Sequence, residues 1–223
     1  MDSEKISLLE AEVEKTPDDP ELLLELANQY IRSKQPKRTL DTLKTAYKLV
    51  PESSELAATI GNIAVSLGEI DTAEYYFKIA IGLNPRATVC HHNLGLIYMA
   101  QNNYKNAVES FQSIIKYEKQ NASAHNDLGV AQCCLGQGQK ALESFRQALK
   151  YDPRYVKAFV SSCELLQEMK LPDEGIKLVR EFEKNNPANP GIVNDWKIKF
   201  SKNKSADNSG SKPVRKSFRL DAD

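Results

Sequence analysis

Prolines recur along this chain at one fixed spacing. Five of them are separated by 34 residues or by twice that number, and residue 119, a lysine, fills the one empty place in the series; the five are Pro17, Pro51, Pro85, Pro153 and Pro187. Proline ends a helix because it lacks an amide donor and its ring clashes with the preceding turn. A constant period of this length indicates a tandem array of small helical units, each of which contacts its neighbours.

Side-chain size follows the same period. We divide the chain into units 20–53, 54–87, 88–121, 122–155 and 156–189. The eighth residue of every unit is small: Ala27, Gly61, Gly95, Gly129 and Cys163. The twenty-fourth is large and apolar: Leu43, Phe77, Phe111, Phe145 and Val179. Helix axes about 8–10 Å apart leave no room for a long side chain where they cross. Each unit is therefore predicted to be two helices that cross at the small residue, with the large side chain filling the adjoining hollow.

This pattern resembles the tetratricopeptide repeat family over residues 20–189, most closely in the second to fourth units. The resemblance implies an all-α fold, a right-handed superhelical α-solenoid of about five helix-turn-helix repeats with capping helices. Gly68, Asn102 and Gly136 are expected in the turn inside a unit, because they tolerate the left-handed backbone that follows a helix.

The two ends are expected to cover the apolar faces of the terminal units. Residues 1–19 are predicted to contain an N-terminal capping helix, with Ile6, Leu9 and Val13 at helical spacing. Residues 190–201 are predicted to be a C-terminal capping helix whose apolar residues dock on the fifth unit: Val193, Trp196, Ile198 and Phe200. Residues 202–223, with six Lys and Arg against three Asp, are predicted to be a disordered basic tail that competes with partners for an acidic groove.

Composition limits the class of partner. The formal net charge is zero and 27% of residues are charged, which indicates neither a nucleic-acid partner nor a membrane surface. No run of about 18 apolar residues occurs, so no membrane insertion is expected. The four cysteines show neither a disulfide framework nor zinc-ligand spacing, which fits a reducing compartment, and a cytoplasmic location is expected.

Two local patterns resemble cofactor or metal sites. Gly136, Gly138 and Ala141 satisfy the glycine spacing of a dinucleotide-binding turn, but a predicted helix precedes them where that turn requires a strand. His91 and His125 are one period apart, which places them on helices about 10 Å apart, whereas zinc ligands lie about 2 Å from the ion. No nucleophile, base and orienting group can be assembled. We expect no enzyme activity, no cofactor and no metal.

Function is then expected on the concave surface, which the first helices of the repeats form in this family. An Asn side chain both donates and accepts a hydrogen bond, so a row of them can pair with the backbone of an extended peptide. The predicted peptide-binding residues are Asn28, Asn62, His92, Asn93, Leu96, Asn126, Asp127 and Val130. The chain departs from the chaperone-binding members of the family, since Leu24, Thr59 and Val89 replace most of the groups they need.

The sequence therefore favours a non-catalytic adaptor or scaffold that binds a protein or peptide partner. Two alternatives stay open. One is a self-assembling scaffold, because stacked repeats can also bind a neighbouring copy. The other is a regulatory module of a signalling system, since Arg215 and Arg219 resemble the opening of a bacterial domain that binds cyclic dinucleotides, although the chain ends before the rest of such a domain.

Overall fold

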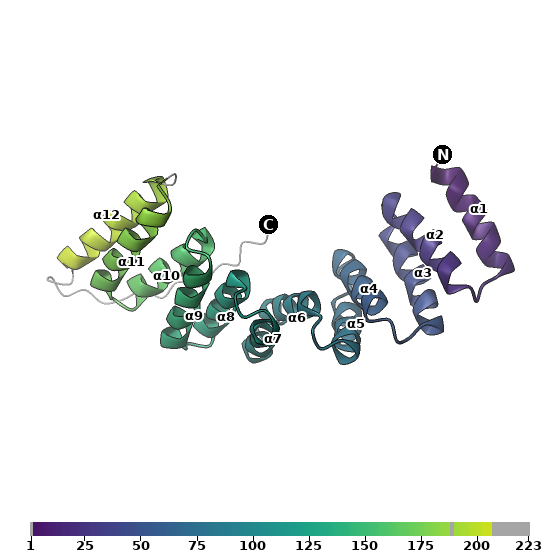
Figure 1. Ribbon diagram of the computed structural model, residues 1–223, viewed down its shortest axis with the longest axis horizontal. Helices are drawn as coiled ribbons and strands as arrows, with labels where there is room; N and C mark the ends of the chain where they lie inside the picture. Colours follow the sequence, from purple (N-terminus) through teal and green to yellow (C-terminus); the bar gives the residue numbers. More distant parts are fainter. Residues whose placement is uncertain (1, 188–189, 207–223) are drawn as a thin grey trace. The chain divides into compact units, whose positions relative to one another are not determined.

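The computed structural model describes residues 2–187 and 190–206, and within them every regular element is an α-helix (Figure 1). The first helices of the repeats, with one more at the C-terminal end, are α2 Pro20–Arg32, α4 Ser54–Ser66, α6 Thr88–Ala100, α8 Ala122–Cys134, α10 Val156–Glu168 and α12 Pro190–Ala206. The second helices, with one more at the N-terminal end, are α1 Asp2–Lys15, α3 Pro36–Leu49, α5 Ile70–Leu83, α7 Tyr104–Tyr117, α9 Gly138–Tyr151 and α11 Pro172–Asn185. Successive first residues in each series are 34 positions apart.

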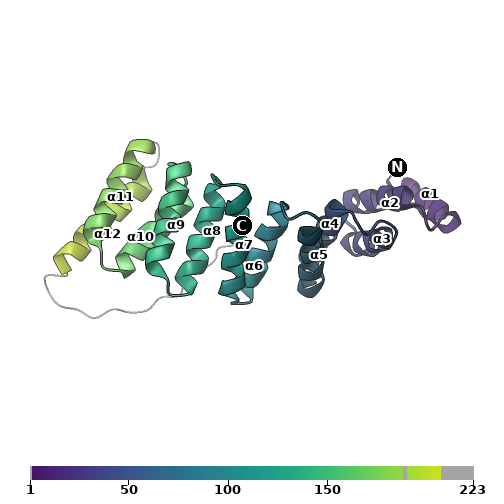
Figure 2. The same cartoon turned by 60° about the horizontal axis from the view of Figure 1, so that its bottom comes forward.

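The chain divides inside α6, after Ile97, into two compact units. In the N-terminal unit α2 packs on α3, α4 packs on α5, and α1 covers α2. In the C-terminal unit α8 packs on α9, and α10 lies against both α9 and α11, as Figure 2 shows. Helix α12 packs on α11 at the end of this unit. The predicted all-α fold of paired helices is confirmed.

The turn inside each helix pair has the same backbone conformation. Positive φ angles between 54° and 73° occur once in each pair, at residues that are one period apart: Lys34, Gly68, Asn102, Gly136 and Lys170. The prediction for Gly68, Asn102 and Gly136 is confirmed. Lys34 and Lys170 were not anticipated, because a residue with a Cβ is disfavoured in the left-handed region by about 1 kcal/mol or more. At these two lysines the geometry of the turn therefore outweighs the intrinsic preference of the residue for a negative φ angle.

Close crossings at glycine hold the helix pairs together. A Cβ placed on Gly61 would lie 2.6 Å from Cε1 of Phe77, and one on Gly129 would lie 2.5 Å from Cε1 of Phe145. Both phenylalanine rings are fully buried. The predicted pairing of a small eighth residue with a Phe at the twenty-fourth is confirmed in these two repeats, and the ring occupies the volume that any side chain on the glycine would need.

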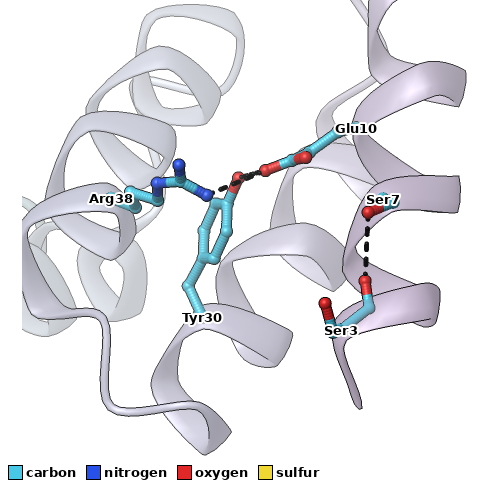
Figure 3. Close-up of polar contacts among 5 residues, drawn as sticks. All are labelled: Ser3, Ser7, Glu10, Tyr30 and Arg38. Atoms are coloured by element: carbon cyan, nitrogen blue, oxygen red, sulfur yellow. Dashed lines mark hydrogen bonds and ion pairs between the residues drawn. The ribbon is translucent and has the colours of Figure 1, made fainter. Parts of the chain in front are cut away.

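The N-terminal helix is fixed to the array by one carboxylate. Glu10 of α1 accepts hydrogen bonds from Oη of Tyr30 on α2, at 2.5 Å, and from Nη1 of Arg38 on α3, at 3.1 Å (Figure 3). Burial of the phenol, its hydrogen bond to Glu10 and the charge of Glu10 raise the pKa of Tyr30, so the hydroxyl stays protonated and remains a donor. Ile6 and Leu9 are buried beside Tyr30 and Leu26, which confirms the expected apolar side of α1.

The C-terminal helix differs from the prediction in two respects. Val193, Trp196 and Phe200 are buried as expected, but Ile198 is 53% exposed, because the buried residues repeat at spacings of three and four and Ile198 lies off that face. Helix α12 also continues to Ala206, past the predicted end at residue 201. Lysine is a good helix former, and extending a formed helix is easier than starting one. Residues 207–223, most of the predicted tail, lie outside the described residues.

Both end helices carry a lysine where the internal repeats are small. Helix α1 starts 34 residues before α3, so Lys5 takes the place of Thr39, and α12 starts 34 residues after α10, so Lys197 takes the place of Cys163. Each lysine is paired with the neighbouring helix: Nζ of Lys5 lies 3.1 Å from Oε1 of Glu25, and Nζ of Lys197 lies 2.7 Å from Oε1 of Glu183. The two end helices therefore carry ion-paired lysines at positions where the internal repeats have a smaller side chain.

We predict that Gly129→Leu destabilises the protein by roughly 1–3 kcal/mol or more, because the new side chain overlaps the Phe145 ring. Thermal unfolding followed by circular dichroism measures the effect. Gly82→Ala is the matched control, since Gly82 lies in α5 with open space at its Cβ position. A melting temperature for Gly129→Leu equal to that of the control would contradict the crossing.

We predict that Tyr30→Phe loosens α1 and lowers the free energy of unfolding by about 1–2 kcal/mol, because it removes a hydrogen bond to a charged acceptor. Hydrogen exchange should become faster in the amides of α1 and stay unchanged in α9. Tyr75→Phe removes a hydroxyl from a side chain that is 61% exposed and serves as control. Equal exchange in the two variants would show that Glu10 does not anchor α1 through Tyr30.

Candidate peptide-binding face

Three helices of the N-terminal unit present amides and apolar side chains on their exposed sides. Asn28 and Asn62 are exposed on α2 and α4, and Asn93 is half-buried on α6. Three residues further along each helix, one turn away, stands an apolar side chain that is between 42% and 44% exposed: Ile31, Val65 and Leu96. We call these six residues the amide face. Residues three apart on a helix lie on the same side, so each amide adjoins an apolar side chain.

Two of the predicted amides are joined to each other. Nδ2 of Asn93 donates a hydrogen bond of 2.8 Å to Oδ1 of Asn62, which links α6 to α4. An amide group has one acceptor oxygen and two donor hydrogens, so the bond leaves the donors of Asn62 and the oxygen of Asn93 for other groups. One donor and one acceptor are the complement of a peptide group. The pair can therefore bind the backbone of an extended chain.

Carboxylates lie beside the amide face. Glu21 and Glu25 are exposed on α2 and Glu55 on α4, and the sequence of α6 contains no Asp, Glu, Lys or Arg. Residues 1–97 contain 15 Asp and Glu against 10 Lys and Arg, a formal net charge of −5. The electrostatic field of this unit therefore attracts ligands with basic groups, and salt would shorten the distance over which this attraction acts.

The predicted residues on α8 are placed differently. Asn126 is only 5% exposed; its Nδ2 donates to Oδ1 of Asp127 at 3.2 Å, and its Oδ1 is buried without a hydrogen-bond partner. The expectation that Asn126 lies clear of the core is wrong, because α8 is buried on more than one side, with His125, Leu128 and Gln132 buried as well. Val130 is half-buried against the apolar cluster of the C-terminal unit.

The repeated histidines have a structural role. Nε2 of His91 donates to the carbonyl oxygen of Pro85 at 3.1 Å, and Nε2 of His125 donates to that of Lys119 at 3.0 Å. Each ring thus ties the first turn of its helix to the segment six residues earlier, which accounts for their spacing of one period. His92, also predicted in the binding site, is half-buried and makes an interaction of its own. Within residues 2–187 and 190–206, no three His, Cys, Asp or Glu are grouped as metal ligands.

The cysteines are buried or half-buried thiols. Burial raises the pKa of Cys90, Cys134 and Cys163, and burial together with the nearby Cys134, Glu168 and Glu164 raises the pKa of Cys133 to about 12. Thiolates are the reactive form of cysteine, and burial disfavours that form at all four residues. In the described part of the chain, none of the helices is long and apolar enough to span a bilayer.

Comparison with known proteins identifies the repeat. Two family models match, described as TPR repeat over residues 95–136 and as tetratricopeptide repeat over residues 122–155. No curated protein sequence matches the chain. Tetratricopeptide repeats generally mediate contacts between proteins and are typically non-catalytic.

Solved structures share the fold. The C-terminal part of a TPR repeat-containing protein from Cytophaga hutchinsonii is 13% identical with a TM-score of 0.74, covering 93% of this chain and 84% of that one. YrrB, described as a TPR protein with an unusual peptide-binding site, is 16% identical with a TM-score of 0.66, covering 88% and 97%. MamA from Desulfovibrio magneticus RS-1, from residue 41 to its end, is 17% identical with a TM-score of 0.64, covering 86% and 97%. The chain therefore contains tetratricopeptide repeats within residues 95–155, and it has the helix-pair fold that these solved structures share.

Proposed function

We propose that this protein is a non-catalytic adaptor whose amide face holds an extended segment of a partner protein. The observation that carries the proposal is the Asn62–Asn93 hydrogen bond, which leaves the donors of Asn62 and the oxygen of Asn93 for the backbone of a bound segment. Val65 and Leu96 lie one helical turn from these amides and would contact the side chains of the segment. A backbone-directed contact tolerates different side chains, which suits an adaptor.

Charge adds a preference to this contact. Glu21 and Glu55 stand on the same helices as Asn28 and Asn62, so a segment with Lys or Arg next to its apolar residues is favoured. Exposed charges contribute little to affinity, about 0–1 kcal/mol for a pair, and act mainly on the rate of association. YrrB has a peptide-binding site by its description, which supports a similar use of the same fold. A binding role of Asn126, Asp127 and Val130 stays a prediction.

We predict that Asn62→Ala with Asn93→Ala weakens partner binding by a few kcal/mol at most, since each hydrogen bond contributes about 0.5–1.5 kcal/mol. The melting curve should stay nearly unchanged, because Asn62 is exposed and Asn93 half-exposed. The full chain and the double variant are used side by side to capture proteins from cells of the source organism, and mass spectrometry compares what each retains.

Asn194→Ala is the matched control, since Asn194 is an exposed amide on α12. Partners of the amide face are the proteins captured by the wild type and the control and lost from the double variant. Capture of every protein in equal amounts by all three would exclude the amide face as the binding site.

Self-assembly through the ends of the array is the alternative function, and the lysines of the two end helices are relevant to it. Among the described residues no second helix follows α12 and no first helix precedes α1, so two copies could in principle complete one more helix pair. Lys197 occupies the position that crosses the second helix in such a pair, where the internal repeats have Ala, Gly or Cys, and Lys5 stands where they have Thr, Ala or Gly. This arrangement supports closed ends and disfavours growth by head-to-tail stacking.

We predict that Lys5→Ala with Lys197→Ala increases self-association. The lost ion pairs are exposed and contribute about 0–1 kcal/mol each, so the fold should be retained. The mean mass from light scattering should rise with concentration above 25.0 kDa more steeply than for the wild type. Lys48→Ala with Lys140→Ala, which removes two exposed lysines inside the array, is the control. An identical concentration dependence in the two double variants would contradict the role of the end lysines.

A further inference from the structure

The fifth repeat departs from the others at its seventh residue. Four repeats have a large apolar side chain at this position, and the fifth has Ser162: the others are Leu26, Ile60, Leu94 and Leu128. Ser162 is fully buried in α10, and its Oγ donates to the backbone oxygen of Ala158 at 2.7 Å. The hydroxyl is satisfied by its own helix, so the shorter side chain leaves space without leaving an unpaired polar group.

That space opens as a groove between α9 and α11, over α10. The groove has a volume of about 550 Å³, within the range of ligand sites in proteins. Ser162 and Leu166 of α10 are buried at its floor, together with Leu142 of α9 and Phe182 of α11. Leu149 and Leu178, both half-buried, complete its apolar lining. We call this the Ser162 groove.

Phe182 is a second departure of the fifth repeat beside Ser162. Four repeats carry Leu or Phe at the twenty-fourth position, where the fifth has Val179, and the fifth instead has Phe182 three residues later. The Phe182 ring stacks on Phe159 with 3.9 Å between centroids and 11° between planes. The stacked ring forms part of the apolar floor of the groove together with Ser162.

The rim of the groove is charged. Arg146 of α9 and Glu174 of α11 form an ion pair of 2.6 Å that joins the two walls. Lys150 of α9 and Lys177 of α11 also line the groove, and neither makes an ion pair among the described residues. Glu181 is the remaining acid, so the rim has a surplus of one positive charge once Arg146 and Glu174 are paired.

The dimensions fit a short peptide. Glu174 and Asn185 line one wall 11 residues apart, about 16 Å at 1.5 Å per helical residue, which accommodates five residues of an extended chain at about 3.3 Å each. Residues 207–223 of this chain have four Lys and Arg against three Asp, so a rim with surplus positive charge does not attract them. The same rim attracts an acidic segment of another protein.

We propose that the Ser162 groove is a second docking site, which takes a short segment of a partner protein with bulky apolar side chains next to carboxylates. The apolar side chain fills the hollow over Ser162, and the carboxylate lies near Lys150 or Lys177. This site is independent of the amide face, because it lies in the C-terminal unit and uses other helices. Its ligand differs from that of the amide face in the sign of its charge.

The test uses two labelled six-residue peptides and the full chain. One peptide has two leucines between two aspartates, and the matched peptide has lysines in place of the aspartates. Fluorescence anisotropy measures their affinities for the wild type, Ser162→Leu and Ser161→Leu. Ser162→Leu restores the kind of residue found in the other repeats and fills the hollow, whereas Ser161→Leu adds the same side chain on α10 outside the groove lining.

The aspartate peptide should bind the wild type more tightly than the lysine peptide. Ser162→Leu should weaken it by about tenfold or more, the effect of losing one buried apolar side chain, and Ser161→Leu should change it by less than about twofold. Lys177→Glu, a change at the rim, should also weaken it and should favour the lysine peptide. This variant decides the question if Ser162→Leu melts well below the wild type.

Three outcomes would overturn the proposal. One is unchanged affinity of the aspartate peptide for a folded Ser162→Leu or for Lys177→Glu. Another is a wild type that binds neither peptide. The third is a mean molecular mass in solution that rises with concentration for the wild type and not for Ser162→Leu. That result would mean that the groove binds a second copy of this chain.

Discussion

The close crossing of two helices at a glycine is the interaction on which the rest of this structure depends. The Phe145 ring lies where a Cβ on Gly129 would have to be, and Phe77 lies in the same way against Gly61. A helix pair joined like this buries only part of its apolar surface, so each pair must pack on its neighbours. The turn conformation, the period of 34 and the need for end helices all follow from repeating this one contact.

Most of the fold could be predicted from the sequence because the residues that make this contact recur at a fixed spacing along the chain. The small eighth residues, the apolar residues at the twenty-fourth position and the prolines all repeat, so the helix pairs follow from periodicity without knowledge of any long-range contact. The left-handed turns at Lys34 and Lys170 could not be predicted from local preference. There the repeat geometry outweighs the disfavoured conformation of a residue with a Cβ.

The candidate sites were less predictable, because they depend on which neighbour covers a side chain. The same argument placed Asn62, Asn93 and Asn126 on one surface, but only the structure shows that the first two bond to each other and that the third is buried. The Ser162 groove was missed altogether. The sequence contains the departure at Ser162, but the shape of the groove depends on where the rings of Phe182 and Phe159 lie, which a single sequence does not reveal.

Departures from the repeat are therefore the most informative residues in a chain of this kind. A residue that keeps the pattern is explained by packing, whereas a residue that breaks it must be tolerated by its neighbours or used. Lys5 and Lys197 break it in the two end helices, and both are paired with carboxylates of the adjacent helices. Ser162 breaks it inside the array, where all other repeats fill the space, and the result is an apolar hollow with lysines at its rim. The first departure puts a charge into each end helix, and the second places a serine at the floor of a groove in the fifth repeat.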